Sequence, residues 1–118
     1  MPRDDVASVG HMLDTAQRAV AKIRGKARRD FDTDENLRLA LAYLLQIVGE
    51  AARQVSPGFR ASHPTIPWNA IIGMRHKVVH NYMNVDEDVV WRTATQELEP
   101  LIVELERLLR SAIPEEEG

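Results

Sequence analysis

The chain has 118 residues, of which 44% are hydrophobic, and a formal net charge of −3. This length allows one compact domain with a hydrophobic core and is too short for two, so we expect a single domain over residues 1–118 that ends in an acidic tail at about 114–118. The lack of cysteine excludes disulfides and thiolate metal sites, and no apolar stretch is long enough for a membrane span, so we expect a soluble, cytoplasmic protein.

The charges are distributed unevenly along the chain. Residues 1–85 carry twelve Lys and Arg against eight Asp and Glu, a net of +4, whereas residues 86–118 carry three against ten, a net of −7. Five of the cations form a cluster: Lys22, Arg24, Lys26, Arg28 and Arg29. This cluster has two interpretations, cations that complement the C-terminal end of a helix or an electrostatic contact for RNA phosphates, and we favour the first.

The first half of the chain is expected to form two amphipathic helices. Apolar residues recur at alternating steps of three and four over residues 6–23, and this stripe ends near Gly25. A second stripe covers residues 37–55 and follows good helix-capping residues at 32–34. Pro57 and Gly58 should stop this second helix.

A third helix is expected after a loop. Residues 56–67 contain three prolines and one glycine, which predicts an ordered loop that leads into a helix at about Pro67. This helix should end around His80, because Asn81 tolerates the left-handed conformation with which helices end. Arg75 should share the apolar face of the helix, where it must meet a carboxylate, a carbonyl group, a subunit interface or a ligand phosphate.

The last helix is expected to begin near Asp86 and to be kinked by Pro100, with two shorter helices as the alternative. Strand patterns are nearly absent. The fold class predicted from this pattern is all-α, an antiparallel four- to five-helix bundle of the up-and-down type. Only two Trp, two Tyr and two Phe are present, which argues against a dedicated module for stacking single-stranded bases.

The best candidates for chemistry lie close together near the end of the third helix. Arg75, His80 and Tyr82 place a permanent cation, an imidazole and a phenol within eight residues. Arginine binds a phosphate through a rigid fork of donors, and histidine gives or takes a proton near neutral pH. The three residues together suit phosphodiester cleavage or nucleotide binding.

Two further interpretations concern the neighbours of these residues. His76 and His80 are four residues apart and invite a metal site, but the surrounding segment offers no Cys, Asp or Glu, so we expect no metal. His76 is interpreted as a surface or supporting residue. Glu50 is interpreted as a buried ion-pair partner for a cation such as Arg75 or Arg53.

Several segments, in order along the chain, are similar to one known family. They are Gly49-Glu50-Ala51, His63-Pro64 with Ile66-Pro67-Trp68, Gly73-Met74-Arg75, His80-Asn81-Tyr82 and Trp91. Together they resemble the HepT-like branch of the HEPN superfamily, the higher eukaryote and prokaryote nucleotide-binding proteins, over nearly the whole chain. One position departs from the pattern, because the residue after the motif arginine is commonly asparagine in such sequences and is His76 in this one.

The resemblance implies a helical homodimer that acts as a metal-independent endoribonuclease without cofactors. Such a dimer can also be part of a higher assembly. Such proteins are typically the toxin of a toxin–antitoxin pair whose antitoxin is a minimal nucleotidyltransferase. By motif position Arg75 and His80 would be catalytic, and Tyr82 would be the residue to which the antitoxin adds AMP. The expected products are RNA ends with a 2′,3′-cyclic phosphate and a 5′-hydroxyl.

The chemistry of the residues agrees with these roles. His80 would act as general base or acid on the ribose 2′-hydroxyl or the leaving 5′-oxygen, while Arg75 would hold the phosphate and its developing charge. His76, Asn81 and Glu50 are interpreted as supporting residues. Only RNA carries the internal nucleophile, so DNA should not be cut.

Two other functions stay open at this point. One is a catalytically silent module in which the same pocket binds a nucleotide or a protein partner. The other is a structural helical dimer in which Arg75 is only a member of an ion pair. The sequence alone does not distinguish these from the ribonuclease.

Overall fold

The structure, a computed structural model, describes residues 3–81 and 84–112, without the side chains of Arg3, His80 and Asn81. Tyr82 and the acidic tail therefore lie outside the described residues. The helices and strands, in chain order, are α1 (Arg3–Ile23), α2 (Arg28–Asp32), α3 (Glu35–Arg53), α4 (Pro57–Ser62), α5 (Trp68–Ile72), α6 (Met74–Val78), β1 (Val79–Asn81), β2 (Asn84–Val85), α7 (Glu87–Arg92), the π-helical segment η1 (Thr93–Glu97) and α8 (Leu98–Ala112).

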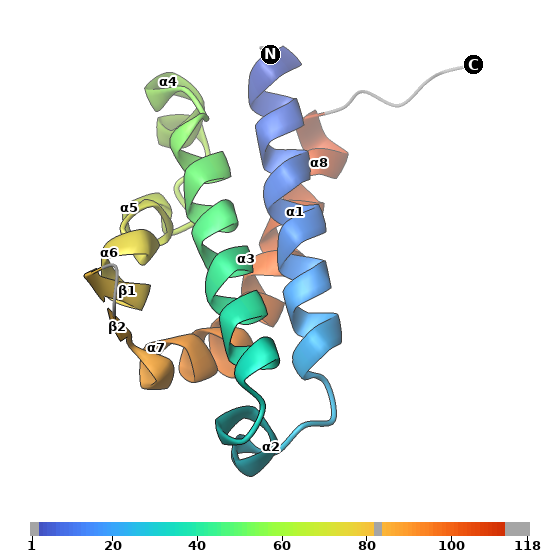
Figure 1. The fold of residues 1–118 in the computed structure, drawn as a ribbon. Coiled ribbons are helices and arrows are strands. Elements are labelled where there is room, and N and C mark those ends of the chain that lie inside the picture. The colour runs from blue at the N-terminus through green and yellow to red at the C-terminus, as the bar shows by residue number, and fades with distance from the viewer. Residues whose placement is uncertain (1–2, 82–83, 113–118) are drawn as a thin grey trace.

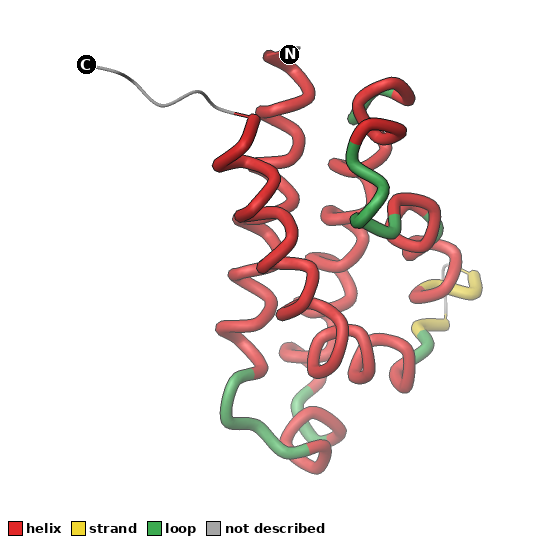
Figure 2. Tube along the Cα trace, turned by 180° about the vertical axis from the view of Figure 1, so that it is seen from behind, coloured by secondary structure: helices red, strands yellow, loops and turns green. Residues whose placement is uncertain are grey.

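The predicted all-α class is confirmed, since helices make up most of the described chain. The long helix α1 packs against both α3 and α8 and runs in the direction opposite to these two helices (Figure 1). Between α3 and α8 the chain returns along α3 through the short elements from α4 to α7 (Figure 2). None of the described helices is long and apolar enough to cross a bilayer.

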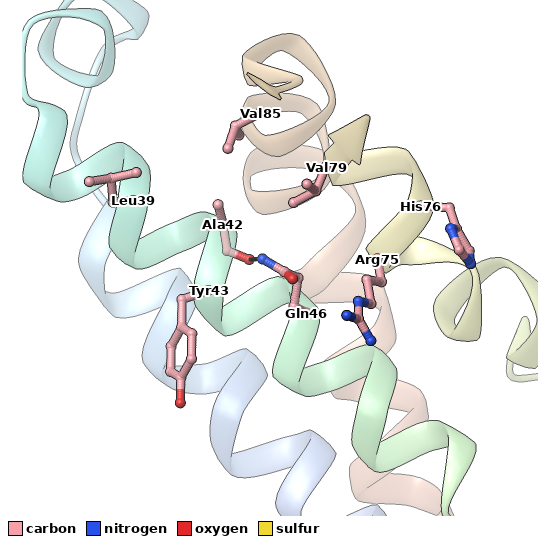
Figure 3. Close-up of a pocket in the computed structure, with 8 residues that line it drawn as sticks. All are labelled: Leu39, Ala42, Tyr43, Gln46, Arg75, His76, Val79 and Val85. Carbon is pink, nitrogen blue, oxygen red and sulfur yellow. Dashed lines mark hydrogen bonds between the residues drawn. The ribbon is translucent and has the colours of Figure 1, made fainter. Parts of the chain in front are cut away.

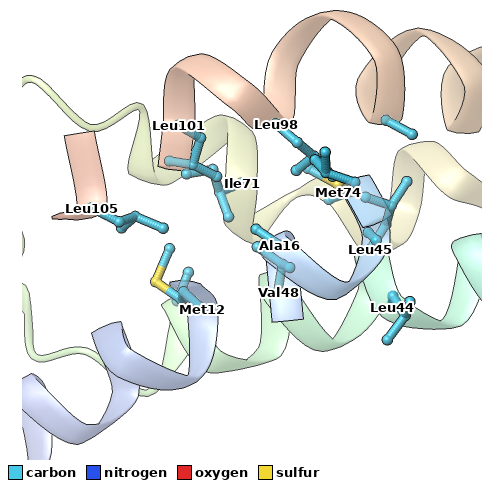
Figure 4. Close-up of a cluster of buried hydrophobic side chains, with 14 of the residues drawn as sticks. Met12, Ala16, Leu44, Leu45, Val48, Ile71, Met74, Leu98, Leu101 and Leu105 are labelled. Atoms are coloured by element: carbon cyan, nitrogen blue, oxygen red, sulfur yellow. The ribbon is translucent and has the colours of Figure 1, made fainter. Parts of the chain in front are cut away.

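The hydrophobic core lies between the long helices and the short elements from α5 to η1. Its members come from every part of the chain, as Met12 of α1, Val48 of α3, Ile71 of α5 and Leu105 of α8 show (Figure 4). All four are buried, with at most 3% of their surface exposed. Truncation of a side chain in such a core typically costs about 2–5 kcal/mol, so these contacts fix the positions of the short elements on α3.

The two long predicted helices are present nearly as expected. α1 ends at Ile23, and Gly25 adopts a left-handed φ of 78° directly after it, a conformation that glycine takes without steric cost. At the start of α3 the side chain of Asp34 accepts a hydrogen bond from the backbone N–H of Leu37 (3.0 Å). This is the capping interaction that satisfies a free donor of the first helical turn.

The interpretation of the basic cluster as a helix end is wrong for its last two members. Arg28 and Arg29 lie in the short helix α2, not at the end of α1. Arg28 donates hydrogen bonds to Asp32 (2.8 Å) and to Asp88 of α7 (2.7 Å), and these bonds raise its pKa above the usual value. This cation therefore links α2 to α7.

The loop predicted at residues 56–67 contains a helix, α4, so this prediction is wrong for residues 57–62. Ser56 caps α4 through its Oγ, and Pro57 stands at the first position of the helix, where the missing N–H costs no hydrogen bond. Pro57 thus starts a new helix instead of only ending the previous one.

The third helix is divided, which corrects the prediction of one helix from about Pro67 to His80. α5 ends at Ile72, Gly73 stands between the two pieces, and α6 ends at Val78. After α6 the chain is extended, and β1 pairs with β2 in an antiparallel arrangement that the sequence did not predict. His80 therefore lies on a strand.

The interruption expected at Pro100 lies earlier, in the π-helical segment at residues 93–97. The N–H of Leu98 donates to the carbonyl of Thr93, five residues back instead of four. Pro100 lies in α8, four residues after Gln96 of this segment, and it has no N–H to donate to the Gln96 carbonyl. The alternative of two shorter helices, α7 and α8, is therefore the one that the structure has.

Candidate functional site

The candidate site lies where α6 meets α3. Gly49 of α3 allows this close approach, because a Cβ built at this position would stand only 2.9 Å from the carbonyl oxygen of Ile71 in α5 and 3.7 Å from the Cβ of Met74 in α6. The absence of a side chain at Gly49 lets α5 pack directly on the α3 backbone. α6 follows α5 after the single residue Gly73, so this contact also sets the position of Arg75.

Arg75 is exposed, which corrects the expectation that it lies on the buried face of its helix. The break at Gly73 places Met74 and Val78 of α6 in the core, and 62% of the Arg75 side chain remains exposed. The guanidinium therefore needs no complete neutralisation by the protein. It is accessible to an anion from solvent.

Glu50 pairs with Arg75, as expected from the sequence, but it is not buried as expected, since 41% of its side chain is exposed. Its Oε2 lies 3.6 Å from Nη1 of Arg75 and 3.9 Å from Nη1 of Arg53, one turn further along α3. Ion pairs at such exposed positions usually stabilise a fold by about 0–1 kcal/mol. The main effect of Glu50 is thus on the position of the Arg75 guanidinium.

Arg75 borders an open hollow of about 570 Å³ between α3, α6 and the two strands. Its lining residues, drawn in Figure 3, are Leu39, Ala42, Tyr43, Gln46, Arg75, His76, Val79 and Val85. The wall of the hollow is largely apolar, and Arg75 of α6 adds a positive charge at its edge. A concave apolar surface with a few polar groups is typical of ligand-binding sites.

The candidate residues of the motif are placed as follows. Arg75 points toward α3, whereas His76 lies on another side of α6 and points away from Arg75 (Figure 3). His80 and Asn81 follow Val79, a lining residue, on β1, but their side chains are outside the described part of the structure. Tyr82 is also outside it, so Arg75, Glu50 and His76 are the candidates that the described structure places at this site.

Sequence reasoning missed the α3 side of the hollow. Leu39 and Tyr43 are exposed over 54% and 63% of their surface, and Gln46 and Glu50 continue the same face of α3. These four residues recur at steps of four, three and four, beside the stripe that faces the core. Glu50 was already a candidate, and this second stripe was the signal in the sequence that would have identified Leu39, Tyr43 and Gln46.

The charges near the site favour an anion. α6 exposes Arg75, His76 and Lys77 in succession, and Glu50 pairs with the first of these residues. Within residues 3–81 and 84–112, leaving aside the undescribed side chains, no three His, Asp or Glu side chains are grouped so that they would bind a metal. The arrangement provides a phosphate with an accessible guanidinium beside an apolar surface.

Comparison with known proteins gives a consistent result. Residues 12–108 match the family described as ribonuclease HepT-like. A provisionally named RNase of Caldanaerobacter subterraneus subsp. tengcongensis is 32% identical over 100 residues, which cover 85% of this chain and 89% of the relative. A provisionally named ribonuclease HepT of Thermococcus cleftensis is 35% identical over 79 residues, which cover 67% and 72%. No solved structure matches the chain with statistical significance.

Proposed function

The chain belongs to the HepT-like ribonuclease family, and from this premise we propose that it is a metal-independent endoribonuclease whose catalytic residues are Arg75 and His80. The observation that carries the proposal is the exposed guanidinium of Arg75 at the edge of an open hollow, held by Glu50 at 3.6 Å. This geometry supports the binding of an RNA phosphate, since a rigid fork of donors is presented to solvent.

In the proposed reaction the ribose 2′-oxygen attacks the adjacent phosphorus and the bond from phosphorus to the 5′-oxygen breaks. One proton leaves the 2′-hydroxyl and one is taken up by the 5′-oxygen, and His80 acts as the general base or acid for these transfers. Arg75 stabilises the negative charge that develops on the non-bridging oxygens. The products are a 2′,3′-cyclic phosphate and a 5′-hydroxyl.

We further propose that the enzyme is a homodimer of up-and-down helical bundles that meet beside Arg75. In a two-fold dimer the same surface of each subunit contacts the other, so two Arg75 and two His80 would line one cleft. Leu39, Val79 and Val85 support this arrangement, because they place apolar surface next to the cation.

We propose that the protein is the toxin of a toxin–antitoxin pair and that a nucleotidyltransferase antitoxin transfers AMP from ATP to the hydroxyl of Tyr82, with release of pyrophosphate. Tyr82 follows His80 by two residues in the sequence. The added phosphate and nucleoside would compete with RNA for Arg75 and obstruct the cleft. The charge and the size of the added AMP group would therefore both inhibit RNA cleavage.

The deciding experiment compares two arginines that share one partner. Arg75 and Arg53 both pair with Glu50 and both are 62% exposed, so Arg53→Ala is a matched control for Arg75→Ala. In the presence of a chelator, wild type and Arg53→Ala should cleave RNA equally, whereas Arg75→Ala and His80→Ala should be at least about 10²-fold slower. Equal losses in the two arginine variants, or a wild type that binds RNA without cutting it, would refute the proposal and favour a silent binding module.

A further inference from the structure

The hollow extends along α3 beyond Arg75, and an exposed aromatic ring borders this extension. Tyr43 is exposed over 63% of its surface, although its neighbours Ala42 and Leu44 in the sequence are buried. An isolated exposed aromatic side chain is common and needs no explanation. Tyr43 differs because it lines the same hollow as the proposed phosphate-binding arginine (Figure 3).

The spacing along α3 relates the ring to the proposed phosphate position. Tyr43, Gln46 and Glu50 lie on one face of the helix, and Tyr43 and Glu50 are separated by two turns, about 10 Å along the axis. Glu50 contacts the Arg75 guanidinium, so a phosphate bound to this guanidinium would lie beside a position of α3 that is roughly 10 Å along the axis from Tyr43. The surface between them is formed in part by Gln46, whose Nε2 donates to the carbonyl of Ala42 (3.2 Å).

We propose that Tyr43 is a stacking subsite for a nucleobase of single-stranded RNA, in the nucleotide next to the phosphate held by Arg75. This inference rests on the proposed function, because it uses the same phosphate position. Bases stack on aromatic side chains through their flat faces, whatever their identity. A single platform of this kind favours single-stranded RNA over a duplex and gives little sequence preference.

The ring and the cation are complementary to the two parts of a nucleotide. The aromatic face of Tyr43 suits the base, and Arg75 suits the phosphate attached to it. The hollow, at about 570 Å³, is large enough for a nucleoside and is open to solvent. If Tyr43 instead contacted a second copy of the chain, its ring would serve only as apolar surface. Leucine could then replace it, whereas leucine cannot replace a ring that stacks on a base.

The test uses RNA binding, so that it does not depend on cleavage. The probe is a fluorescent single-stranded RNA with 2′-O-methyl groups throughout, which removes the nucleophile. Tyr43→Ala should weaken its binding by roughly 5- to 150-fold, the range of base stacking on aromatic side chains. Tyr43→Phe should bind like wild type and Tyr43→Leu should bind as weakly as Tyr43→Ala, because leucine keeps the apolar surface but cannot stack.

The matched control is Val103→Ala on α8, which also removes an exposed apolar side chain (49% exposed) and should leave RNA binding unchanged. A second probe lacks one base beside the central phosphate. Wild type should bind this probe more weakly than the complete probe, and the affinities of wild type and Tyr43→Ala for it should be nearly equal. Full RNA affinity of Tyr43→Leu, or a change in the molecular mass of the assembly in all three Tyr43 variants, would overturn the proposal and assign the ring to a contact between copies.

Failure of this inference is separable from failure of the proposed function. If Arg75→Ala abolishes cleavage while the Tyr43 variants bind and cleave normally, the stacking subsite alone is wrong. If wild type does not cleave RNA but Tyr43→Ala loses binding and Tyr43→Phe keeps it, the nuclease is wrong and the subsite stands. A wild type that does not bind the probe refutes the subsite directly.

Discussion

Replacing Gly49 by alanine tests how the contact between α3 and α5 positions the site. The added Cβ would stand 2.9 Å from the carbonyl oxygen of Ile71, and because this atom belongs to the backbone it cannot move aside as a side chain would. α5 must therefore shift, and α6 moves with it. Overpacking of this kind typically costs about 1–3 kcal/mol, whereas alanine gains up to about 1 kcal/mol over glycine within a helix.

Gly10→Ala is the matched control for this change. Gly10 also lies within a long helix, α1, but a Cβ at this position would meet no atom within 4 Å. The helix-propensity gain is the same in both variants, so the difference between their free energies of unfolding isolates the steric term. We expect Gly10→Ala to be the more stable by about 1–3 kcal/mol, which corresponds to roughly 4–12 °C in Tm for a domain of this size.

The assay combines urea or thermal unfolding with RNA cleavage by the folded variants. A shift of α6 separates Arg75 from Glu50, so Gly49→Ala should cleave RNA more slowly than Gly10→Ala at a temperature where both are folded. If Gly49 acts through Arg75, the substitution should cause no further loss of activity in an Arg75→Ala background. Equal stability of the two glycine variants would refute the steric argument, and additive losses would refute the link to Arg75.

Two further predictions concern other parts of the molecule. Asp5→Ala should lower the free energy of unfolding in urea by about 1–3 kcal/mol, because the buried Asp5 carboxylate accepts hydrogen bonds from N and Oγ of Ser56 (2.8 and 2.7 Å). The control is Asp4→Ala, which lies at an exposed position and should change this free energy little. After co-expression with the proposed nucleotidyltransferase antitoxin, the wild-type protein should gain the mass of an AMP group, and the Tyr82→Phe variant should not. An unchanged mass of the wild type, or a gain that survives this substitution, would contradict the assignment of Tyr82.

The long helices were predictable because each places an apolar stripe on the core over several turns. The stripe at residues 37–55 corresponds to α3, and the capping residues before it correctly marked its start at Asp34. The short helices α2 and α4 were not predicted, because five or six residues are too few to show a helical period. Their formation depends on contacts distant in sequence, such as those of Arg28 with Asp88 and Ser56 with Asp5.

The site was predictable only in part, for a related reason. The ion pair between Glu50 and Arg75 was expected because an arginine near an apolar face needs an anion, and the structure confirms the pair. The exposure of Arg75 was not expected, because a helical period carried through Gly73 gave the wrong face. The hollow was not predicted either, since it forms only when α3, α6 and the two strands come together.

The break at Gly73 determines what Arg75 is able to bind. In an uninterrupted helix Arg75 would share the buried face, and a buried guanidinium requires a close carboxylate that is costly to remove. In the observed arrangement the pair with Glu50 is long, at 3.6 Å, and exposed, so its net contribution is about 0–1 kcal/mol. A phosphate that offers two oxygens to the fork of Arg75 makes stronger, charge-assisted bonds and displaces Glu50 at little cost. Under the proposed function Glu50 would therefore position the arginine without withholding it from an RNA phosphate, which a structural ion pair in the core would not do.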